Sequence, residues 1–472
     1  MHLLSWRANG DGFDVALAVN RLLAAGAEAW WLTAPAAPAE PGDYLFDAAP
    51  ELIARLHALG VAVSPYDRTL PAGATRLTAP AVALFTGDAT GYPYWGYYAL
   101  CLLRLGLPYV PVDGRAIAAG ALDAANLFVI PGGFATWGLD AAESAPGADA
   151  QVRRFLDRGG RAIGSCGGAF YLSAGRPGWT GTAWAKPRFT HEYLQSGVGI
   201  VEIALKRGQL ALGLPPTIDM PYYHGPLYEE LGDGIEVAGT FRALVAPGRL
   251  GIDNPLDEAK FAGSMAGRPA ILRADGPRGR AVLFSPHPEM GDLLRKYITL
   301  DGYARKYLPI RGFPVLRDTM RHYRTSDSPS FRLVLNAVHD LVGDAGMPAV
   351  SPARPDVPDA AAVAAGLRGQ LARRAAADDL LAPLVDDVVA SLDVRLERAA
   401  PRLIREAHRL SAEDRRGLRT LWAHLGAAIE AHARSNAEKT LGQTLMEVEL
   451  GTCLMETWAR CAQFEAAPAE VE

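Results

Sequence analysis

The chain has 472 residues, of which 49% are hydrophobic, and a formal net charge of −5 at pH 7. This length is too great for a single hydrophobic core and predicts two or three domains. The mixed, slightly acidic charge argues against nucleic acid as the main partner.

Residues 1–78 are predicted to form a small α/β unit. His2–Trp6 and Glu28–Leu32 have the composition of strands. The amphipathic segment Asp14–Ala24 lies between them and stops just before a glycine, which is a helix-end signal. Pro50–Leu59 repeats the helical pattern. This unit precedes the part of the chain that carries the candidate chemistry.

Residues 79–312 alternate between strands and helices. Strands are expected at 81–86, 109–112, 127–130 and 161–166, with helices running up to residue 105 and over 150–158. This alternation predicts an α/β fold with a mostly parallel, doubly wound sheet of the flavodoxin type. In such sheets, sites gather beyond the carboxyl ends of the strands. Four candidate site residues fall at such ends: Thr86, Gly132, Cys166 and His287.

The carboxyl-terminal part of the sequence predicts helices. Residues 313–359 are expected to be a helical segment followed by a linker whose prolines exclude a helix. Residues 360–472 are predicted to form a helical bundle, because apolar residues recur there at helical spacing. Such a bundle is typical of a homodimer interface or of a surface for a protein partner.

Cys166 lies in the segment Gly164-Ser165-Cys166-Gly167-Gly168, between a predicted strand and a predicted helix. Only residues with little side-chain bulk tolerate the sharp turn that pushes a side chain out of regular structure there. The free N–H groups of the following helix favour thiolate over thiol. We therefore predict a reactive cysteine, although an isolated cysteine is more often a small buried hydrophobe.

A histidine and a carboxylate follow the strand-like run Ala281–Phe284, in the sequence Ser285-Pro-His287-Pro-Glu289. Residues i and i+2 of an extended chain face the same side. Glu289 can therefore bond one ring nitrogen of His287 and leave the other to face a nucleophile, as in a catalytic triad. His-Pro-Glu alone is a weak signal, but after a cysteine turn it predicts catalysis by Cys166, His287 and Glu289.

A glycine turn ends the apolar strand that precedes the cysteine strand. Asn126–Ile130 is followed by Pro131-Gly132-Gly133. Backbone amides that no side chain obstructs are what an oxyanion hole needs. An ordinary turn between a strand and a helix is the alternative, but the position one crossover before Cys166 favours an oxyanion hole.

These three segments, in this order, resemble the class I glutamine amidotransferase-like superfamily. Within it, the chain is most similar to the domain at the N-terminus of eukaryotic biotin–protein ligases and of related bacterial proteins. The resemblance spans about residues 80–293 and includes Val82–Gly87 and Met220–Pro226. It implies these roles: Cys166 as nucleophile, His287 as general base, Glu289 as its orienting group, and the amides of Gly133 and Gly167 in the oxyanion hole.

The sequence departs from the pattern of that superfamily at two places. Glutamine-using members usually carry Gln shortly after the cysteine turn, where this chain has Gly168-Ala-Phe170-Tyr171. Relatives of the ligase-associated type tend to have Asn where His224 stands. Both differences predict a pocket that binds a group other than the glutamine side chain. Biotin is not implied either, because the chain has no separate ligase domain.

Substrate-binding residues are expected at loop ends near the cysteine. Polar and aromatic residues gather in Thr86-Gly87-Asp88 and in Tyr222-Tyr223-His224. Any single Tyr or Trp in this region is more often a packing residue, but the clustering at presumed loop ends favours a role in the pocket. We predict these six residues as candidates.

The four cysteines predict an environment that keeps thiols reduced. Cys101, Cys166, Cys453 and Cys461 are spread along the chain without the paired spacing of a metal site. We expect no metal and no cofactor. Three of the cysteines, all but Cys166, are expected to be packing residues. No signal peptide and no apolar run of membrane length are visible, so a cytoplasmic protein without a membrane partner is predicted.

Two classes of function remain open at this point. The first is a cysteine hydrolase or amidotransferase-like enzyme that cleaves the C–N bond of a small-molecule or peptide amide through a thioester. The second is a non-catalytic ligand-binding or regulatory module of the same fold, or a scaffold organised by the carboxyl-terminal helices. The complete Cys–His–Glu set favours the enzyme, because a pure binder has no need of all three residues.

Overall fold

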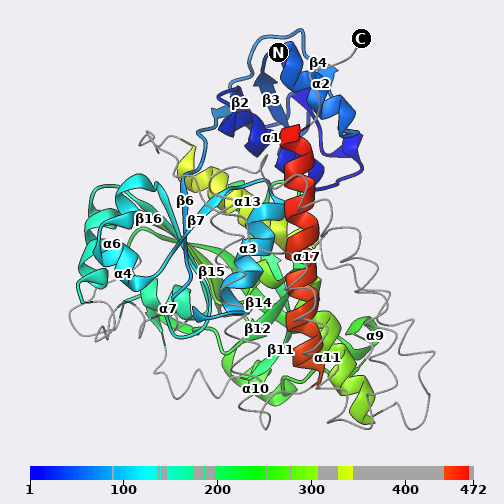
Figure 1. Cartoon of the computed structure of the whole chain (residues 1–472). Coiled ribbons are helices and arrows are strands. Elements are labelled where there is room, and N and C mark those ends of the chain that lie inside the picture. Colours follow the sequence, from blue (N-terminus) through cyan, green and yellow to red (C-terminus); the bar gives the residue numbers. More distant parts are fainter. Residues whose placement is uncertain are drawn as a thin grey trace.

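The protein has an α/β architecture built on one large mixed sheet (Figure 1). The computed structural model describes residues 1–87, 90–135, 139, 146–174, 185–187, 197–250, 252–276, 279–306, 328–343 and 441–466.

The large sheet has nine strands in the order β12-β11-β14-β15-β16-β9-β8-β6-β7. Their bounds in chain order are β6 Val82–Phe85, β7 Tyr109–Val112, β8 Leu127–Ile130, β9 Arg161–Ser165, β11 Val198–Leu205, β12 Thr217–Tyr223, β14 Ile235–Leu244, β15 Pro269–Gly276 and β16 Gly279–Phe284. The strands from β16 through β7 pair in parallel. The strands from β12 through β16 pair antiparallel.

The expectation of a mostly parallel sheet is therefore wrong for one half of the sheet. The crossover helices on which that expectation rests are confined to the first half of the region. In the other half, β15 ends at Gly276 and β16 begins at Gly279, and a connection that short permits only antiparallel pairing.

Helices cover both faces of the parallel half, and the alternation of side chains along each strand serves both layers (Figure 1). In β8, Leu127 and Val129 join the core under helix α3 (Tyr94–Arg104), while Phe128 and Ile130 join the core under the opposite layer. The helices of that opposite layer are α4 Gly114–Ala118, α6 Ala148–Asp157 and α7 Gly167–Leu172. A strand buried on both faces reads as a continuous apolar run, which is why these strands are visible in the sequence.

A second sheet forms the amino-terminal unit. It has five strands in the order β4-β1-β3-β2-β5, and every neighbouring pair is antiparallel. Its elements are β1 His2–Leu4, α1 Asp14–Ala24, β2 Glu28–Leu32, β3 Tyr44–Asp47, α2 Pro50–Ala58, β4 Ser64–Pro65 and β5 Ala74–Arg76. The central strand β3, which lies between β1 and β2, is not predicted from the sequence.

Helix α13 (Pro329–Val342) joins the two sheets. Ser328 caps its first turn by accepting from the Ser330 N–H. From α13, the His339 ring packs edge-on against Tyr44 of β3, with ring centroids 5.5 Å apart. One turn of the same helix also binds the large sheet, since Asp340 lies 2.6 Å from Arg273 Nε on β15.

Helix α17 (Leu441–Ala466) packs along α3 and along α11 (Gly291–Lys306). The Tyr97 hydroxyl on α3 contacts Met446 Sδ at 2.7 Å. Lys296 Nζ on α11 lies 2.8 Å from the buried Glu449 carboxylate. The described side chains of α17 thus belong to the same core as α3. Residues 360–440, the rest of the predicted bundle, lie outside the described residues.

Replacing Trp458 by alanine is expected to lower the free energy of unfolding by about 3–5 kcal/mol, the usual cost of deleting a large buried aromatic ring. Trp458 is fully buried in α17. Urea unfolding followed by circular dichroism measures the change. Leu70→Ala is the control, because Leu70 is 42% exposed and its truncation is expected to change stability by less than about 0.5 kcal/mol. An equal, small effect of both changes would contradict the docking of α17 into the core.

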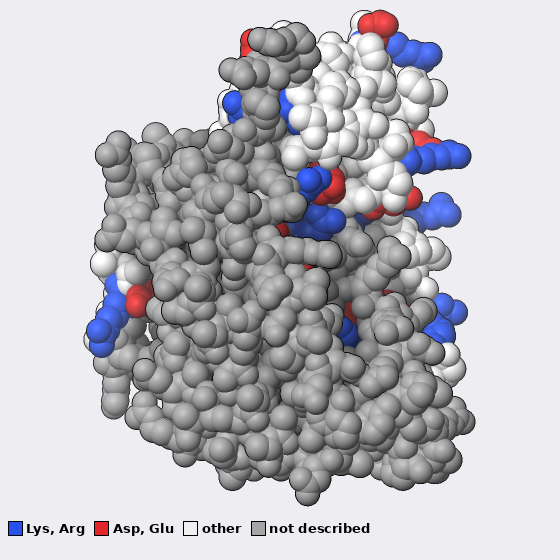
Figure 2. Space-filling view, turned by 45° about the vertical axis from the view of Figure 1, so that its right-hand side comes forward, with Lys and Arg blue, Asp and Glu red and all other residues white. Residues whose placement is uncertain are grey.

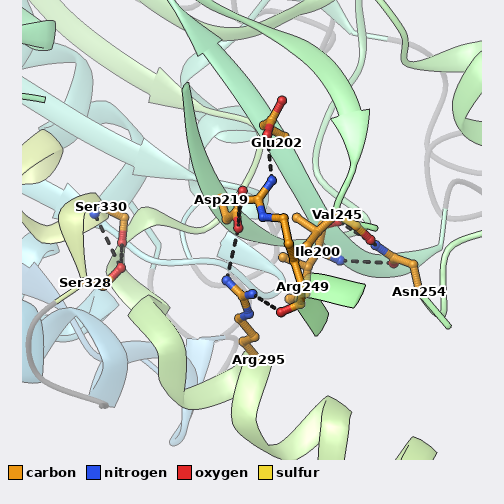
Figure 3. Close-up of polar contacts among 9 residues, drawn as sticks. All are labelled: Ile200, Glu202, Asp219, Val245, Arg249, Asn254, Arg295, Ser328 and Ser330. Carbon is orange, nitrogen blue, oxygen red and sulfur yellow. Dashed lines mark hydrogen bonds and ion pairs between the residues drawn. The ribbon is translucent and has the colours of Figure 1, made fainter. Parts of the chain in front are cut away.

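Charged residues fix the antiparallel edge of the large sheet to the helices beside it (Figure 3). Arg249, in helix α9 (Pro247–Leu250), lies 2.8 Å from Glu202 on β11 and 2.6 Å from Asp219 on β12. Arg295 of α11 lies 3.1 Å from the same Asp219 carboxylate and donates to the Arg249 carbonyl. Two guanidinium groups therefore share one carboxylate across three elements.

The surface is mixed in charge on the face that Figure 2 shows, where basic and acidic side chains of the described residues lie next to one another. Among the helices in the described ranges, none has the combination of length and apolarity that crossing a bilayer requires. The remaining described elements are the short pair β10 (Ala185–Pro187) and β13 (Tyr228–Leu231), helix α10 (Glu258–Ser264) and the 3₁₀ turns η1 (Arg7–Asn9), η3 (Ala121–Ala124), η4 (Gln209–Ala211) and η5 (Pro288–Met290).

Candidate active site

Cys166 lies in a strained turn between β9 and α7. Its backbone has φ +49° and ψ −110°, a region that residues with a side chain rarely occupy and that costs about 1–3 kcal/mol. The turn is held because the Cys166 N–H donates to the Phe284 carbonyl at the end of β16, over 2.9 Å. The side chain is 7% exposed. The predicted cysteine elbow is present in the backbone.

The glycines after Cys166 are required by close backbone contacts. A Cβ added at Gly167 would lie 1.8 Å from the Gly133 carbonyl oxygen, and one at Gly168 would lie 2.0 Å from the Ile130 carbonyl oxygen. No side chain fits at either position. The elbow and the Pro131-Gly132-Gly133 turn are therefore in direct backbone contact.

The amides predicted for the oxyanion hole belong to Gly133 and Gly167. Within the described ranges, neither the Gly133 N–H nor the Gly167 N–H donates a hydrogen bond. Gly132 lies between the two functional side chains, because a Cβ added there would be 3.4 Å from Cys166 Cβ and 2.6 Å from His287 Cε1. The three glycines thus border the space next to the sulfur.

His287 follows β16 and reaches the edge of the sheet where Cys166 lies. β16 and β9 are parallel neighbours, with Phe284 opposite Ser165, so both chains leave the sheet at the same edge. The His287 N–H donates to the Pro221 carbonyl over 2.8 Å, which fixes the segment against β12. The imidazole is fully buried.

Glu289 binds the imidazole as the i, i+2 spacing predicted. His287 Nδ1 and Glu289 Oε1 are 2.7 Å apart, and both side chains are almost completely buried. Burial alone would lower the pKa of His287, but the Glu289 carboxylate and then the Cys166 sulfur outweigh it and raise the pKa to about 10. Nε2 has no hydrogen-bond partner of normal geometry in the described part of the chain. The Glu289 carboxylate thus stabilises the imidazolium that forms when His287 accepts a proton.

The Cys166 thiol has a hydrogen-bond acceptor in the site. Sγ lies 3.1 Å from the carbonyl oxygen of Tyr223, the last residue of β12. A carbonyl oxygen accepts only from a protonated sulfur, so this contact belongs to the thiol form. Removal of the proton would release the sulfur from this contact.

The segment after β12 forms another wall near the sulfur. His224 has φ +51°, and its Nδ1 accepts from the Gly197 N–H over 3.3 Å. The rings of Tyr223 and His224 are 5.1 Å apart and nearly perpendicular. Tyr222 is fully buried and packs edge-on against Phe241, so core packing accounts for its ring.

The candidates after β6 are placed in part. Thr86 is 5% exposed, and its N–H donates to the Val112 carbonyl. At Gly87, an added Cβ would lie 2.7 Å from the Phe85 ring. Asp88 lies outside the described residues. Within the described ranges, no group of three or more His, Cys, Asp or Glu side chains has the geometry of a metal site.

Sequence reasoning missed two residues that hold Glu289. Ser165 Oγ donates to Glu289 Oε2 over 2.9 Å, and the Tyr98 hydroxyl lies 2.5 Å from the same Ser165 Oγ. All three side chains are buried. Ser165 is adjacent to the cysteine, but Tyr98 lies in an apolar helical stripe, and no local signal distinguishes it from its neighbours. Two more phenols, of Tyr94 and Tyr228, lie near the sulfur; burial and then nearby groups that include Cys166 raise the pKa of each.

No protein-family model and no curated protein matches the sequence. Among solved structures, one glutamine amidotransferase is 20% identical with a TM-score of 0.31, and the match covers 47% of this chain and 97% of that one. A glutamine amidotransferase from Thermotoga maritima is 15% identical with a TM-score of 0.34, and the match covers 55% of this chain and 98% of that one. Both likenesses are weak, so the activity of this chain has to be judged from its own side chains.

Proposed function

We propose that this chain is a cysteine-dependent hydrolase or amidotransferase-like enzyme that cleaves an amide C–N bond through a thioester. One observation carries the proposal. A buried imidazole, held by a carboxylate at 2.7 Å, lies at the same sheet edge as a cysteine whose backbone is strained to φ +49°. Perturbed titratable groups beside a potential nucleophile are typical of active sites.

The proposed reaction uses each of the three side chains once per half-reaction. Cys166 gives its proton to Nε2 of His287, and the thiolate attacks the amide carbonyl carbon. The imidazolium then protonates the leaving nitrogen as the C–N bond breaks, which leaves an acyl thioester on Cys166. His287 next removes a proton from water, the hydroxide attacks the thioester, and the acid departs as the thiol is restored. Glu289 stabilises the imidazolium in both halves.

The amides of Gly133 and Gly167 are the proposed donors to the tetrahedral oxyanion. Both are free of other acceptors in the described ranges, and their backbones touch. Each such donor typically contributes about 3–4 kcal/mol to transition-state stabilisation.

The proposed substrate is a small-molecule or peptide amide. The pocket residues proposed for it include Tyr223, whose carbonyl accepts from the sulfur, and His224, whose ring packs against the Tyr223 ring. The kinship with the amino-terminal domain of biotin–protein ligases remains a proposal that depends on the cysteine elbow and the His-Pro-Glu segment. The released amine or ammonia would leave the site or pass to a separate partner.

Trapping of the thioester tests this proposal. The chain is incubated with a panel of primary amides and short peptide amides, quenched in acid, and digested for mass spectrometry. We expect one substrate class to add its acyl mass to the peptide that contains Cys166 and to release an amine. Cys166→Ala is expected to reduce turnover to the uncatalysed rate, whereas Cys101→Ala leaves it intact because Cys101 is a buried packing residue on α3. Turnover that survives Cys166→Ala would overturn the proposal.

A non-catalytic binding module is the second candidate, and one observation favours it. The Cys166 thiol is 7% exposed and already has an acceptor in the Tyr223 carbonyl, as a satisfied structural thiol would. Alkylation with iodoacetamide at neutral pH separates the two candidates. Rapid, selective labelling of Cys166 supports the enzyme, and labelling as slow as that of Cys101 supports the binder.

A further inference from the structure

The second oxygen of the Glu289 carboxylate is the start of a buried hydrogen-bonded chain. Oε1 faces His287 Nδ1 at 2.7 Å, and Oε2 accepts from Ser165 Oγ at 2.9 Å. Ser165 Oγ in turn lies 2.5 Å from the Tyr98 hydroxyl on α3. None of the four side chains is more than 1% exposed. Water therefore cannot substitute for any of these contacts without rearrangement of the core.

The direction of each hydrogen bond in this chain is determined by the number of protons available. Ser165 has one hydroxyl proton and gives it to the carboxylate, so the Tyr98 hydroxyl must be the donor to Ser165. An ionised carboxylate can only accept, so Nδ1 of His287 must carry a proton. The neutral imidazole is then left with its lone pair on Nε2, the atom that must accept the thiol proton. The hydroxyl donors Tyr98 and Ser165 thus fix the tautomer of His287 through the Glu289 carboxylate.

The phenol of Tyr98 is suited to this role because it keeps its proton. Burial, with the Glu289 charge added to it, raises the pKa of Tyr98 well above its ordinary value, although the bond to Ser165 opposes the rise. Two other titratable groups of α3, Tyr97 and Cys101, interact electrostatically with the Glu289 charge. Their pKa values are also raised, chiefly by burial. From the elbow, Cys166 faces His287. Tyr97 and Cys101 are therefore expected to keep their protons near neutral pH.

The geometry points to Ser165 and Tyr98 as positioning residues that orient the Glu289 carboxylate and fix the tautomer of His287. Neither residue contacts the reacting atoms in this scheme. The inference rests on the proposed function, because it concerns how the same histidine is prepared to activate Cys166. Loss of the Ser165 hydroxyl would leave a buried carboxylate oxygen without a donor, which loosens the orientation of Glu289 and weakens its hold on the imidazolium.

The test is the pH dependence of Cys166 alkylation by iodoacetamide, followed by mass spectrometry on the full chain. In Ser165→Ala, we expect the rate at pH 7 to fall by about 10- to 100-fold and the midpoint of the pH profile to move to higher pH. Tyr98→Phe keeps the packing volume and is expected to move the midpoint in the same direction by less. Thermal melts establish that each variant is folded, and if Ser165→Ala does not fold, Tyr98→Phe decides.

Two matched variants serve as controls. Tyr97→Phe removes a buried phenol from the same helix, but its hydroxyl contacts Met446 of α17 instead of Ser165. Ser285→Ala removes a fully buried hydroxyl that has no hydrogen-bond partner in the described part of the chain. Both are expected to keep the wild-type midpoint. A general loss of stability would lower the folded fraction of any variant without moving the midpoint.

The outcomes separate this inference from the proposed function. A shifted midpoint in Ser165→Ala and Tyr98→Phe, but not in the controls, supports positioning. Fast, selective labelling of wild-type Cys166 with unchanged midpoints in both test variants would overturn the positioning role alone. Wild-type labelling no faster than that of Cys101 would overturn the proposed function, and this inference with it.

Discussion

Replacing His287 by alanine is expected to slow amide cleavage by about 10²–10⁴-fold, the usual contribution of a general acid–base residue. Without the imidazole, no base removes the proton of the Cys166 thiol. The proton then stays on the sulfur, which keeps its hydrogen bond to the Tyr223 carbonyl. The leaving nitrogen also loses its proton donor. Steady-state turnover of the trapped substrate measures the loss, and the rate of Cys166 alkylation is expected to fall in parallel.

His339 offers a matched control for this change. It is also a buried imidazole, in α13, but among the described residues no carboxylate faces it: its ring nitrogens contact the Tyr44 hydroxyl and Asn20 Oδ1. Burial lowers the pKa of His339 to about 3, whereas the pKa of His287 is raised to about 10. His339→Gln is expected to reduce stability and leave the turnover of the folded fraction unchanged. Equal losses of turnover in both variants would contradict a chemical role for His287.

The opposite pKa shifts of these two histidines also predict opposite effects of pH on the stability of the fold. Because the folded-state pKa of His287 lies above its ordinary 6.5, its pair with Glu289 stabilises the fold fully below about pH 6.5 and loses that stabilisation as the pH rises toward about 10. For His339 the effect is opposite. Its pKa is lowered, so acid protonates a buried ring and destabilises the fold. The carboxylate next to the ring, not burial, is what distinguishes the candidate catalytic histidine.

Replacing Gly167 by alanine is expected to abolish most of the activity and to destabilise the fold by about 1–3 kcal/mol or more. The new Cβ would lie 1.8 Å from the Gly133 carbonyl oxygen, and both groups are backbone, so one of the two turns must move. Movement of either turn misplaces an amide proposed for the oxyanion, and loss of one such donor typically lowers kcat by about 10²–10³-fold. Thermal unfolding and turnover of the folded protein measure the two effects separately.

Gly263→Ala is the control for Gly167→Ala. Gly263 lies in α10, where an added Cβ would meet nothing within 4 Å. This change is expected to stabilise the helix by about 0.5–1 kcal/mol and to leave turnover unchanged. Wild-type kcat in Gly167→Ala would rule out the proposed contact between the two turns.

The parts of the fold that the sequence predicts well are those with a simple apolar pattern. The strands Tyr109–Val112 and Leu127–Ile130 and the helix Asp14–Ala24 have the predicted bounds. The carboxyl ends of parallel strands lie at one edge of the sheet. This rule predicted that Cys166 and His287 lie at the same edge, and the parallel pairing of β16 with β9 agrees with it. The i, i+2 spacing predicted the contact between His287 and Glu289.

The remaining features depend on contacts that no local pattern encodes. Periodicity shows that a helix face is buried, but it does not show what covers that face, so the docking of α17 against α3 was not predicted. Tyr98 and Tyr97 are adjacent phenols in one stripe, and only the tertiary structure shows that Tyr98 reaches Ser165 while Tyr97 reaches Met446. The antiparallel pairing of β11, β12 and β14 was not predicted, because the strand–helix alternation of the first half was extended to the whole region.

The position of α17 has a consequence for how the protein is made. Translation runs from the amino to the carboxyl end, so the ribosome completes Cys166, His287 and Glu289 more than a hundred residues before it reaches Leu441. Until α17 emerges, the nascent chain has every proposed reactive group, but the apolar flank of α3 lacks its cover. The apolar side chains of α3 that contact α17 are therefore expected to stay exposed until then, and a chain truncated before Leu441 is expected to be less soluble than the full chain.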